Sequence, residues 1–231
     1  EMLVILPFEK DFYKKHQVNA HFVGHPLLDA ISDLAPIDAE NFKKEYGLND
    51  KEIIALLPGS REQEVEKMLS LMLSVRDYFK NYQFVIAGAP SLPKEFYQKF
   101  VDYDVHFVSN KTYDLLRCSK AALVTSGTAT LETALLNVPE IVCYRTSTIS
   151  YEIGKRVVKN IKFISLVNLI MDREIVKELI QKELNTENLV TELQKILEGQ
   201  KRDKMLKNYE LLREKLGGKG ASEHAAEIIV N

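Results

Sequence analysis

The sequence has 231 residues, of which 45% are hydrophobic and 28% are charged, and this is the composition of an ordinary globular protein. The formal net charge is only −2, so no basic field would attract nucleic acid, and we expect no nucleic-acid partner. Cys118 and Cys143 lack CxxC or CxxH spacing, which argues against zinc and favours buried free thiols in a reducing cytoplasm. No apolar run approaches the roughly 20 residues that cross a bilayer.

The first residues run directly into an apolar segment, 2–6, which is typical of a buried strand. A chain seldom opens a domain in this way, so we expect the sequence to be part of a longer protein. A charged helix at 9–16 and a strand at 18–23 follow. Glycine and proline then predict a turn at 24–26, and a further helix is expected at 39–46.

Short apolar runs next alternate with segments of helical periodicity. We expect strands at 52–57, 83–87, 104–108, 121–125 and 140–144, and helices at 63–80, 94–101, 113–118 and 128–136. Strands this uniformly apolar are buried on both faces, which is typical of a parallel sheet with helices on both sides. The fold class is therefore α/β. After residue 163 we expect only helices, at 174–184, 186–198, 202–216 and 221–230.

One loop at the end of a predicted strand contains Gly59, Ser60 and Arg61. In open parallel sheets, ligands bind beyond the carboxyl ends of the strands. Glycine lets the backbone approach a ligand, serine can donate a hydrogen bond, and arginine offers a planar fork of donors that suits phosphate. Taken alone, this loop favours a simpler interpretation, in which Ser60 caps the next helix and Arg61 is solvated.

A second loop runs from Thr125 through Ser126 and Gly127 to Thr128, where a helix is expected to begin. Small residues, hydroxyl groups and backbone N–H groups are the parts of an anion cradle, and Glu132 can accept hydrogen bonds from the vicinal hydroxyls of a ribose. The alternative is a helix whose capping box is completed by Glu132, which explains the hydroxyls but not the run of four small residues. Together the two loops indicate a diphosphate site, and neither matches the GxGxxG or Walker A pattern.

Three further features have a structural and a functional interpretation. Asn168 lies among apolar residues, where residue chemistry favours a satisfied core turn over a ligand contact. His25 lies in a turn, and a lone histidine there is more often structural than a general base. An expected helix at 149–159 has a basic face, which is either solvated or in contact with an anionic membrane surface.

Six short motifs occur in a defined order along the chain. They are ILPFE from Ile5, FVGHPL from Phe22, LLPGSR from Leu56, SGTATLE from Ser126, YR from Tyr144 and SLVNLI from Ser165. In order and spacing they resemble the motifs of lipid-A-disaccharide synthases, and the resemblance covers nearly the whole chain. It implies the C-terminal, UDP-binding half of a GT-B glycosyltransferase, in which two Rossmann-like domains face each other across a cleft.

The resemblance also implies how the chain is divided. Residues 1–26 would be the end of the N-terminal domain and the linker, and residues 27–200 the Rossmann-like nucleotide-sugar-binding domain. Residues 201–231 would be a helical tail that crosses back to the N-terminal domain or is swapped within a homodimer. The acceptor pocket and the general base are expected in an N-terminal half that is missing from this chain.

The implied reaction condenses UDP-2,3-diacylglucosamine with 2,3-diacylglucosamine 1-phosphate to give lipid A disaccharide and UDP. The family acts at the cytoplasmic face of the bacterial inner membrane as a peripheral protein. No metal or other cofactor is implied, since no carboxylate cluster suited to Mg²⁺ lies near either loop. Two alternatives are a non-catalytic UDP-binding module and another GT-B enzyme, such as a UDP-N-acetylglucosamine epimerase.

Motif by motif, the resemblance assigns roles to individual residues. Arg61 is implied as the catalytic residue that meets the diphosphate, and Glu132 as the ligand of the ribose. The backbone of Phe107 and Val108 is expected to read the uracil edge. Asn168 is expected to line the donor site, in place of the core turn that its chemistry favours. The rest of the diphosphate cradle is expected to comprise Gly59, Ser60, Ser126, Gly127 and Thr128.

Overall fold

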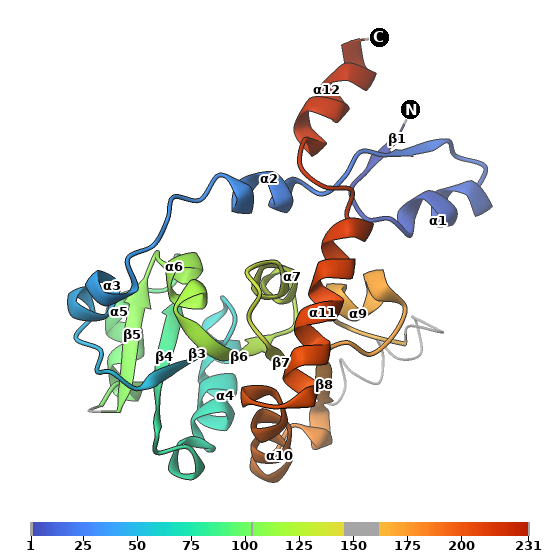
Figure 1. Ribbon diagram of the computed structural model, residues 1–231. Helices are drawn as coiled ribbons and strands as arrows, with labels where there is room; N and C mark the ends of the chain where they lie inside the picture. The colour runs from blue at the N-terminus through green and yellow to red at the C-terminus, as the bar shows by residue number, and fades with distance from the viewer. Residues whose placement is uncertain (1, 103, 146–161, 231) are drawn as a thin grey trace.

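The structure, a computed structural model, describes residues 2–102, 104–145 and 162–230 (Figure 1). Its centre is a sheet of six parallel strands in the spatial order β5-β4-β3-β6-β7-β8. The chain builds outward from β3 to β5 and then returns to the other side of β3 with β6, so the strand order reverses between β3 and β6. The strands are β3 (Glu52–Leu57), β4 (Tyr82–Gly88), β5 (Val105–Ser109), β6 (Ser119–Thr125), β7 (Glu140–Tyr144) and β8 (Lys177–Ile180).

Helices surround this sheet and follow its strands along the chain. Those described between β2 and the C-terminal helix are α2 (Pro26–Ser32), α3 (Ala39–Glu45), α4 (Glu62–Leu73), α5 (Lys94–Tyr97), α6 (Thr112–Arg117), α7 (Thr128–Leu135), α9 (Leu166–Met171), α10 (Thr186–Leu197) and α11 (Gln200–Lys215). Short 3-10 turns are η1 (Arg76–Tyr78), η2 (Gln98–Phe100) and η3 (Gln181–Glu183).

Alternate residues of β3 point to opposite faces of the sheet, and each face has its own hydrophobic core. Ile54 and Leu56 belong to one core, together with buried residues of α4, α10 and α11. Ile53 and Ala55 belong to the other, together with buried residues of α3 and α6. All four side chains have no exposed surface. The α/β fold with a parallel sheet and helices on both faces is therefore confirmed.

The N-terminal segment forms a small unit above the main sheet in the view of Figure 1. In it β1 (Met2–Val4) pairs in parallel with β2 (Ala20–Phe22), and α1 (Glu9–Lys15) connects them. The C-terminal helix α12 (Ala221–Val230) lies beside this unit and contacts α2. Two passages of the chain thus join this unit to the main sheet.

The two passages touch where they cross. The Leu216 carbonyl oxygen accepts a hydrogen bond from the His25 N–H at 3.1 Å. Gly24 lies so close to the start of α12 that a Cβ placed on it would be 3.3 Å from the Cβ of Ala221. The helical tail that the sequence predicts is therefore present, and it is fastened to the turn that follows β2.

The sequence prediction was wrong for the segment after α9. It expected a helix at 174–184, whereas the structure has β8 followed by η3. The apolar residues Val176 and Leu179 are three positions apart, which is helical spacing, but pairing with the open edge of β7 decides in favour of a strand. The helix α2, which starts at Pro26 after the turn, was not predicted. The basic helix expected at 149–159 lies outside the described residues.

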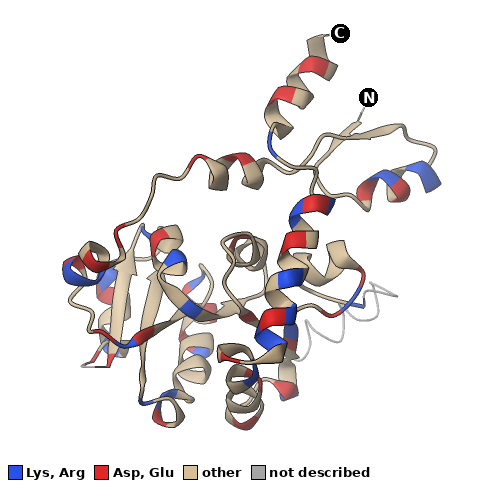
Figure 2. Ribbon diagram, in the orientation of Figure 1, with Lys and Arg blue, Asp and Glu red and all other residues tan. Residues whose placement is uncertain are grey.

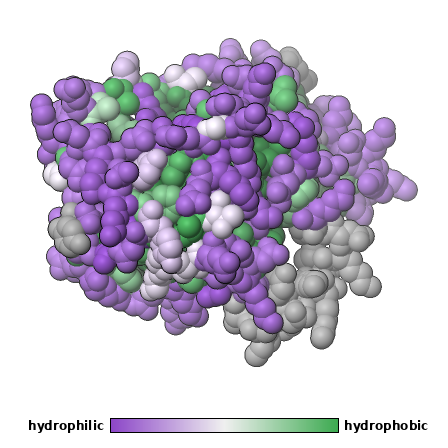
Figure 3. All heavy atoms as spheres, turned by 60° about the horizontal axis from the view of Figure 1, so that its bottom comes forward, coloured by the Kyte–Doolittle hydropathy of each residue, from purple (hydrophilic) through white to green (hydrophobic). Residues whose placement is uncertain are grey.

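Charged residues of both signs are mixed over the outer helices, whereas the strands carry few of them (Figure 2). The space-filling view in Figure 3 shows a mainly hydrophilic face on which apolar side chains are visible only between polar ones. Within the described ranges, no helix is both long and apolar enough to cross a bilayer.

Candidate functional site

A cavity of about 370 Å³ opens at the carboxyl ends of β3, β4 and β6, which are neighbours in the sheet. It lies where the strand order reverses, and such switch points are the usual ligand sites of open α/β sheets. The predicted residues that line it are Gly59, Ser60, Ser126, Gly127, Thr128 and Glu132. Two loops that are far apart in the sequence therefore form one site.

The loop after β3 is held open by glycine. Gly59 has a φ of +104°, which favours glycine, and a Cβ on it would lie 2.5 Å from Oε2 of Glu64, so that side chain would have to move. The carbonyl oxygen of Ser60 accepts a hydrogen bond from Ser91 Oγ at 2.8 Å, which fastens this loop to the one after β4. Arg61 follows as the exposed N-cap residue of α4 and stands beside the cavity wall instead of in it.

Glu64 is a cavity residue that the sequence analysis did not identify. It lies in the first turn of α4 and contributes to the wall beside Gly59. Glu62 is also in this turn, so two carboxylates already complement the positive end of the α4 dipole. The signal for Glu64 was its position three residues after the N-cap residue, where glutamate commonly faces the helix terminus.

The start of α7 differs from that of α4 because nothing complements it. Its N-cap residue is Gly127, its first turn has no acidic residue, and no side chain in the described part of the chain caps it. By contrast, Asp38 caps α3 and Ser165 caps α9. Since the first N–H groups of a helix lack partners within it, α7 presents unpaired N–H groups and the positive dipole end to the cavity at Thr128.

Gly127 also has the backbone conformation that a close approach requires. Its φ of 155° and ψ of −163° lie in a region that is essentially restricted to glycine. A Cβ on Gly127 would meet no atom within 4 Å, so the space in front of this peptide is open. The strained turn therefore exposes backbone at the cavity where a side chain would otherwise stand.

The two hydroxyl residues before Gly127 have different roles in the structure. Ser126 donates its hydroxyl hydrogen to the Ile164 carbonyl oxygen at 3.1 Å, and its N–H to the Cys143 carbonyl oxygen at 3.2 Å. The hydroxyl of Thr125 is buried and has no hydrogen-bond partner among the residues described. Ser126 is thus occupied in holding the loop, and Thr125, which also lines the cavity, keeps an unused donor.

Glu132 is half-buried in the cavity wall and accepts a hydrogen bond from the Tyr113 hydroxyl at 2.8 Å. Burial and this contact with a carboxylate both raise the pKa of Tyr113, so the tyrosine remains a donor. Tyr113 was not predicted as a site residue, because its position 19 residues before Glu132 carries no local signal.

Phe107 and Val108 do not belong to the cavity lining. The Phe107 ring packs on Tyr97, with 4.7 Å between ring centroids, and on Gly88, where a Cβ would lie 2.4 Å from the ring. The Tyr97 hydroxyl accepts a hydrogen bond from the Ala89 N–H at 3.0 Å. These aromatic rings therefore support the loop after β4, which does line the cavity.

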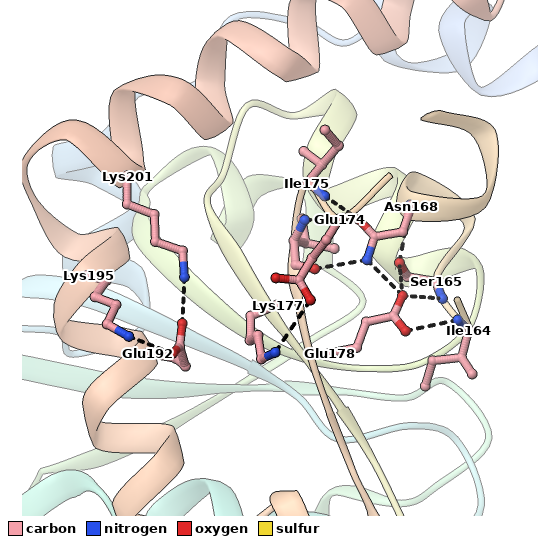
Figure 4. Close-up of polar contacts among 11 residues, drawn as sticks. Ile164, Ser165, Asn168, Glu174, Ile175, Lys177, Glu178, Glu192, Lys195 and Lys201 are labelled. Atoms are coloured by element: carbon pink, nitrogen blue, oxygen red, sulfur yellow. Dashed lines mark hydrogen bonds and ion pairs between the residues drawn. The ribbon is translucent and has the colours of Figure 1, made fainter. Parts of the chain in front are cut away.

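Asn168 is fully buried, and its amide group is completely engaged within the chain (Figure 4). Its Oδ1 accepts from the N–H groups of Ile175 at 2.6 Å and Val176 at 3.0 Å. Its Nδ2 donates to the Val176 carbonyl oxygen at 2.9 Å and to Glu178 at 2.8 Å. Asn168 thus forms the satisfied core turn that residue chemistry favours, and it presents no free polar atom to the cavity.

His25 takes the structural role that its position predicted. Its Nδ1 accepts a hydrogen bond from the Leu27 N–H at 3.2 Å and so caps α2. Burial lowers the pKa of His25, and the nearby Glu9 carboxylate acts in the opposite direction. A neutral ring with Nδ1 as acceptor is the form that this cap needs.

Solved structures of an epimerase and a glycosyltransferase have the same fold. The UDP-GlcNAc 2-epimerase from Neisseria meningitidis, bound to UDP-GlcNAc, superposes with a TM-score of 0.67 at 16% identity over 99% of this chain and 60% of that chain. The kitacinnamycin glycosyltransferase gives a TM-score of 0.64 at 10% identity over 98% of this chain and 53% of that chain. At these identities the likeness concerns the fold, which is GT-B-like.

Sequence comparison identifies the family. Residues 1–230 match the family model of lipid-A-disaccharide synthetase. The lipid-A-disaccharide synthase of Syntrophus aciditrophicus is 39% identical over 235 residues, which cover 97% of this chain and 61% of that protein. The enzyme of Myxococcus xanthus is 35% identical over 238 residues, which cover 99% of this chain and 61% of that protein. The chain spans about 61% of the length of these relatives, and it belongs to the lipid-A-disaccharide synthase family.

Proposed function

We propose that the cavity between β3 and β6 binds the UDP part of a UDP-sugar, and that residues 27–200 are the nucleotide-sugar-binding domain. The observation that carries this proposal is the uncapped start of α7. Its unpaired N–H groups, the open peptide at Gly127 and the unused hydroxyl of Thr125 meet at one cavity. Such a set of donors suits a diphosphate.

The carboxylates at the cavity define the orientation of the nucleotide. Glu62 and Glu64 would repel a phosphate from the start of α4, so the diphosphate is assigned to α7. Glu132 then lies one turn further into α7, where its carboxylate accepts hydrogen bonds from the ribose hydroxyls. Arg61 reaches the diphosphate from the rim, and the backbone at Phe107 and Val108 is the proposed contact of the uracil edge.

Asn168 enters this proposal in a modified role. Its amide group is engaged within the chain, so we assign it to shaping the turn at 164–168 that borders the loop after β6. It acts on the donor site only through that turn, in which the Ile164 carbonyl oxygen accepts a hydrogen bond from the Ser126 hydroxyl.

We further propose that the complete protein condenses UDP-2,3-diacylglucosamine with 2,3-diacylglucosamine 1-phosphate and releases UDP. In this inverting displacement the acceptor hydroxyl attacks the anomeric carbon, and negative charge builds on the leaving diphosphate. Donors already directed at that charge lower the barrier, which is the role of Arg61 and the α7 terminus. The general base and the acceptor pocket are assigned to the part of the protein outside this chain.

The acylated substrates place the reaction at the surface of the bacterial inner membrane, where the enzyme would act as a peripheral protein. Residues 201–231 are proposed either to cross back to the N-terminal domain or to be exchanged within a homodimer. The two other candidate functions, a non-catalytic UDP-binding module and a UDP-N-acetylglucosamine epimerase, use the same cavity. The family match favours the synthase over both.

Titration calorimetry of UDP into the 231-residue chain tests the site directly. We expect the affinity to fall from UDP to UMP and again from UMP to uridine, because each lost phosphate removes contacts with α7. No heat of binding at millimolar UDP would contradict the proposal. Assaying UDP release by the complete protein, with and without the diacylated acceptor, separates the synthase from the epimerase, since only the synthase depends on the acceptor.

A further inference from the structure

Glu178 on β8 is a buried carboxylate that the proposed reaction does not use. Only 7% of its surface is exposed. Its Oε2 accepts a hydrogen bond from the Ile164 N–H at 2.9 Å. Its Oε1 accepts three more, from the N–H and the hydroxyl of Ser165 at 3.0 and 2.7 Å and from Asn168 Nδ2 at 2.8 Å (Figure 4). All four partners are donors, which is the pattern of an ionised carboxylate.

The turn held by Glu178 reaches the cavity through a single residue, Ile164. The N–H of Ile164 donates to Glu178, and the carbonyl oxygen of Ile164 accepts from the Ser126 hydroxyl at 3.1 Å. Ser126 directly precedes Gly127, the N-cap residue of α7. A path of two hydrogen bonds therefore runs from β8 to the start of the helix whose N–H groups face the cavity.

A buried glutamate at position 178 would reduce the stability of the fold if its side chain served only to fill the core. Burying an ionised carboxylate costs several kcal/mol before its hydrogen bonds are counted, and apolar side chains of similar volume usually stabilise a core as well or better. Its neighbour Leu179 is buried in the ordinary way, at 1% exposed. What the carboxylate does, and an apolar side chain could not, is to bind the backbone of the turn at 164–168.

We propose that Glu178 is a positioning residue for the diphosphate cradle. It fixes the turn at 164–168, this turn fixes Ser126, and Ser126 fixes the peptide of Gly127 at the open start of α7. Glu178 itself touches no ligand. This inference rests on the proposed function, because the ligand whose contacts it organises is UDP.

Glu178→Gln is the direct test, because glutamine has the same shape but places an NH₂ group where one acceptor oxygen stood. One of the donors at Ile164 or Ser165 then faces another donor, and the turn shifts. We expect the affinity of the 231-residue chain for UDP to fall about tenfold, which is the effect of one buried group left without its partner. Affinity for uridine, which lacks the diphosphate, is expected to stay unchanged.

Glu174→Gln is the matched control. Glu174 lies four residues earlier in the same segment, is exposed, and contacts only the Lys177 ammonium group in this network, at 3.4 Å (Figure 4). This substitution removes the same charge without touching the turn. We expect it to leave the affinity for UDP within twofold of the parent chain, a change of about 0.4 kcal/mol.

A double-mutant cycle with Ser126→Ala separates positioning from a general loss of stability. If Glu178 acts through Ile164 and Ser126, the two losses of UDP affinity are less than additive, because both substitutions cut one path. Fully additive losses, or an unchanged UDP affinity in folded Glu178→Gln, would overturn the proposal. If Glu178→Gln does not fold, Ser165→Ala replaces it, since it removes one of the four donors and leaves the carboxylate in place.

The outcomes also distinguish this proposal from the proposed function. Failure of the parent chain to bind UDP contradicts both. Binding of UDP by the parent chain together with unchanged binding by folded Glu178→Gln or Ser165→Ala contradicts only the role of Glu178.

Discussion

The Tyr113 hydroxyl donates a hydrogen bond to Oε1 of Glu132 at 2.8 Å, and this bond fixes a carboxylate in the wall of the cavity. Because burial, and after it the contact with Glu132, raises the pKa of Tyr113, the hydroxyl keeps its proton beyond the pH at which an ordinary tyrosine loses it. The bond occupies one side of one carboxylate oxygen and leaves the remaining acceptor positions of Glu132 for a ligand.

Glu132→Gln is predicted to weaken UDP binding by about tenfold, because a carboxylate that accepts from the ribose hydroxyls is replaced by a weaker, neutral acceptor. The same variant is predicted to bind 2′,3′-dideoxy-UDP as the parent chain does. Tyr113→Phe is expected to cost less, about two- to tenfold, the effect of one hydrogen bond. Calorimetric titration of Glu132→Gln with UDP and with 2′,3′-dideoxy-UDP checks this prediction. An equal loss of affinity for the two nucleotides would show that Glu132 does not bind the ribose hydroxyls.

Arg61→Ala in a complete synthase is predicted to lower turnover by about 10²–10³, the usual effect of removing a donor from developing charge. Arg61→Lys is expected to restore part of this, because an ammonium group keeps the charge but not the planar fork. The control is Lys67→Ala, which removes an exposed cation from the second turn of α4 and should leave turnover unchanged. Turnover of Arg61→Ala equal to that of the parent enzyme would refute the catalytic assignment.

Gly127→Ala and Gly199→Ala form a matched pair. Both glycines are N-cap residues, Gly127 of α7 and Gly199 of α11, with a φ of 155° and 81° and a ψ of −163° and −169°. A Cβ meets no atom within 4 Å at either position. Each substitution is predicted to reduce the free energy of unfolding by about 1–3 kcal/mol through backbone strain.

Only Gly127→Ala is predicted to abolish UDP binding, because its new methyl group enters the cavity while that of Gly199→Ala enters solvent. Denaturant unfolding measures the first effect and calorimetry the second. Retention of UDP binding by Gly127→Ala would show that the ligand does not approach this peptide.

Glu140 is predicted to make stability depend on pH. It lies at the start of β7 with no exposed surface, and neither carboxyl oxygen has a partner among the residues described. Burial raises the pKa of Glu140 well above its ordinary value of 4.5. A raised pKa in the folded state means that stability is fully present below pH 4.5 and is lost as the pH rises towards the folded-state pKa.

Glu140→Gln is therefore predicted to remove this loss. Above pH 4.5 the difference in the free energy of unfolding, variant minus parent, should grow by about 1.4 kcal/mol per pH unit until the pH reaches the folded-state pKa. Urea unfolding at several pH values checks the slope. The control is Glu210→Gln, an exposed substitution on α11, whose free energy of unfolding should change with pH in parallel with that of the parent. A parallel pH dependence for Glu140→Gln would refute the prediction.

Much of the site could be predicted from the sequence because parallel strands end at one edge of a sheet. That rule alone brings Ser60 and Thr128 to one cavity, although their loops are distant along the chain. The hydrogen bonds of Asn168 follow from its chemistry, since an amide among apolar residues must find its partners within the fold, and its role at the donor site stays a prediction.

The rest depended on tertiary contacts that leave no local pattern. The hydroxyl of Ser126 is committed to Ile164, and Glu132 is held by Tyr113, in each case by a residue from another part of the chain. The strand β8 was missed because Val176 and Leu179 have helical spacing, and only pairing with the edge of β7 selects the extended form.

The crossing at His25 and Leu216 has a mechanical consequence. Two passages of the chain, one entering the main sheet and one leaving it, are fastened to each other at that point. With a single connection the N-terminal unit could rotate freely relative to the main sheet. Two connections that are joined to each other resist this rotation and allow only a bending motion in which both move. An insertion in one connection, for example beside Gly217, would therefore increase the relative motion of the N-terminal unit and the main sheet without changing the structure of either.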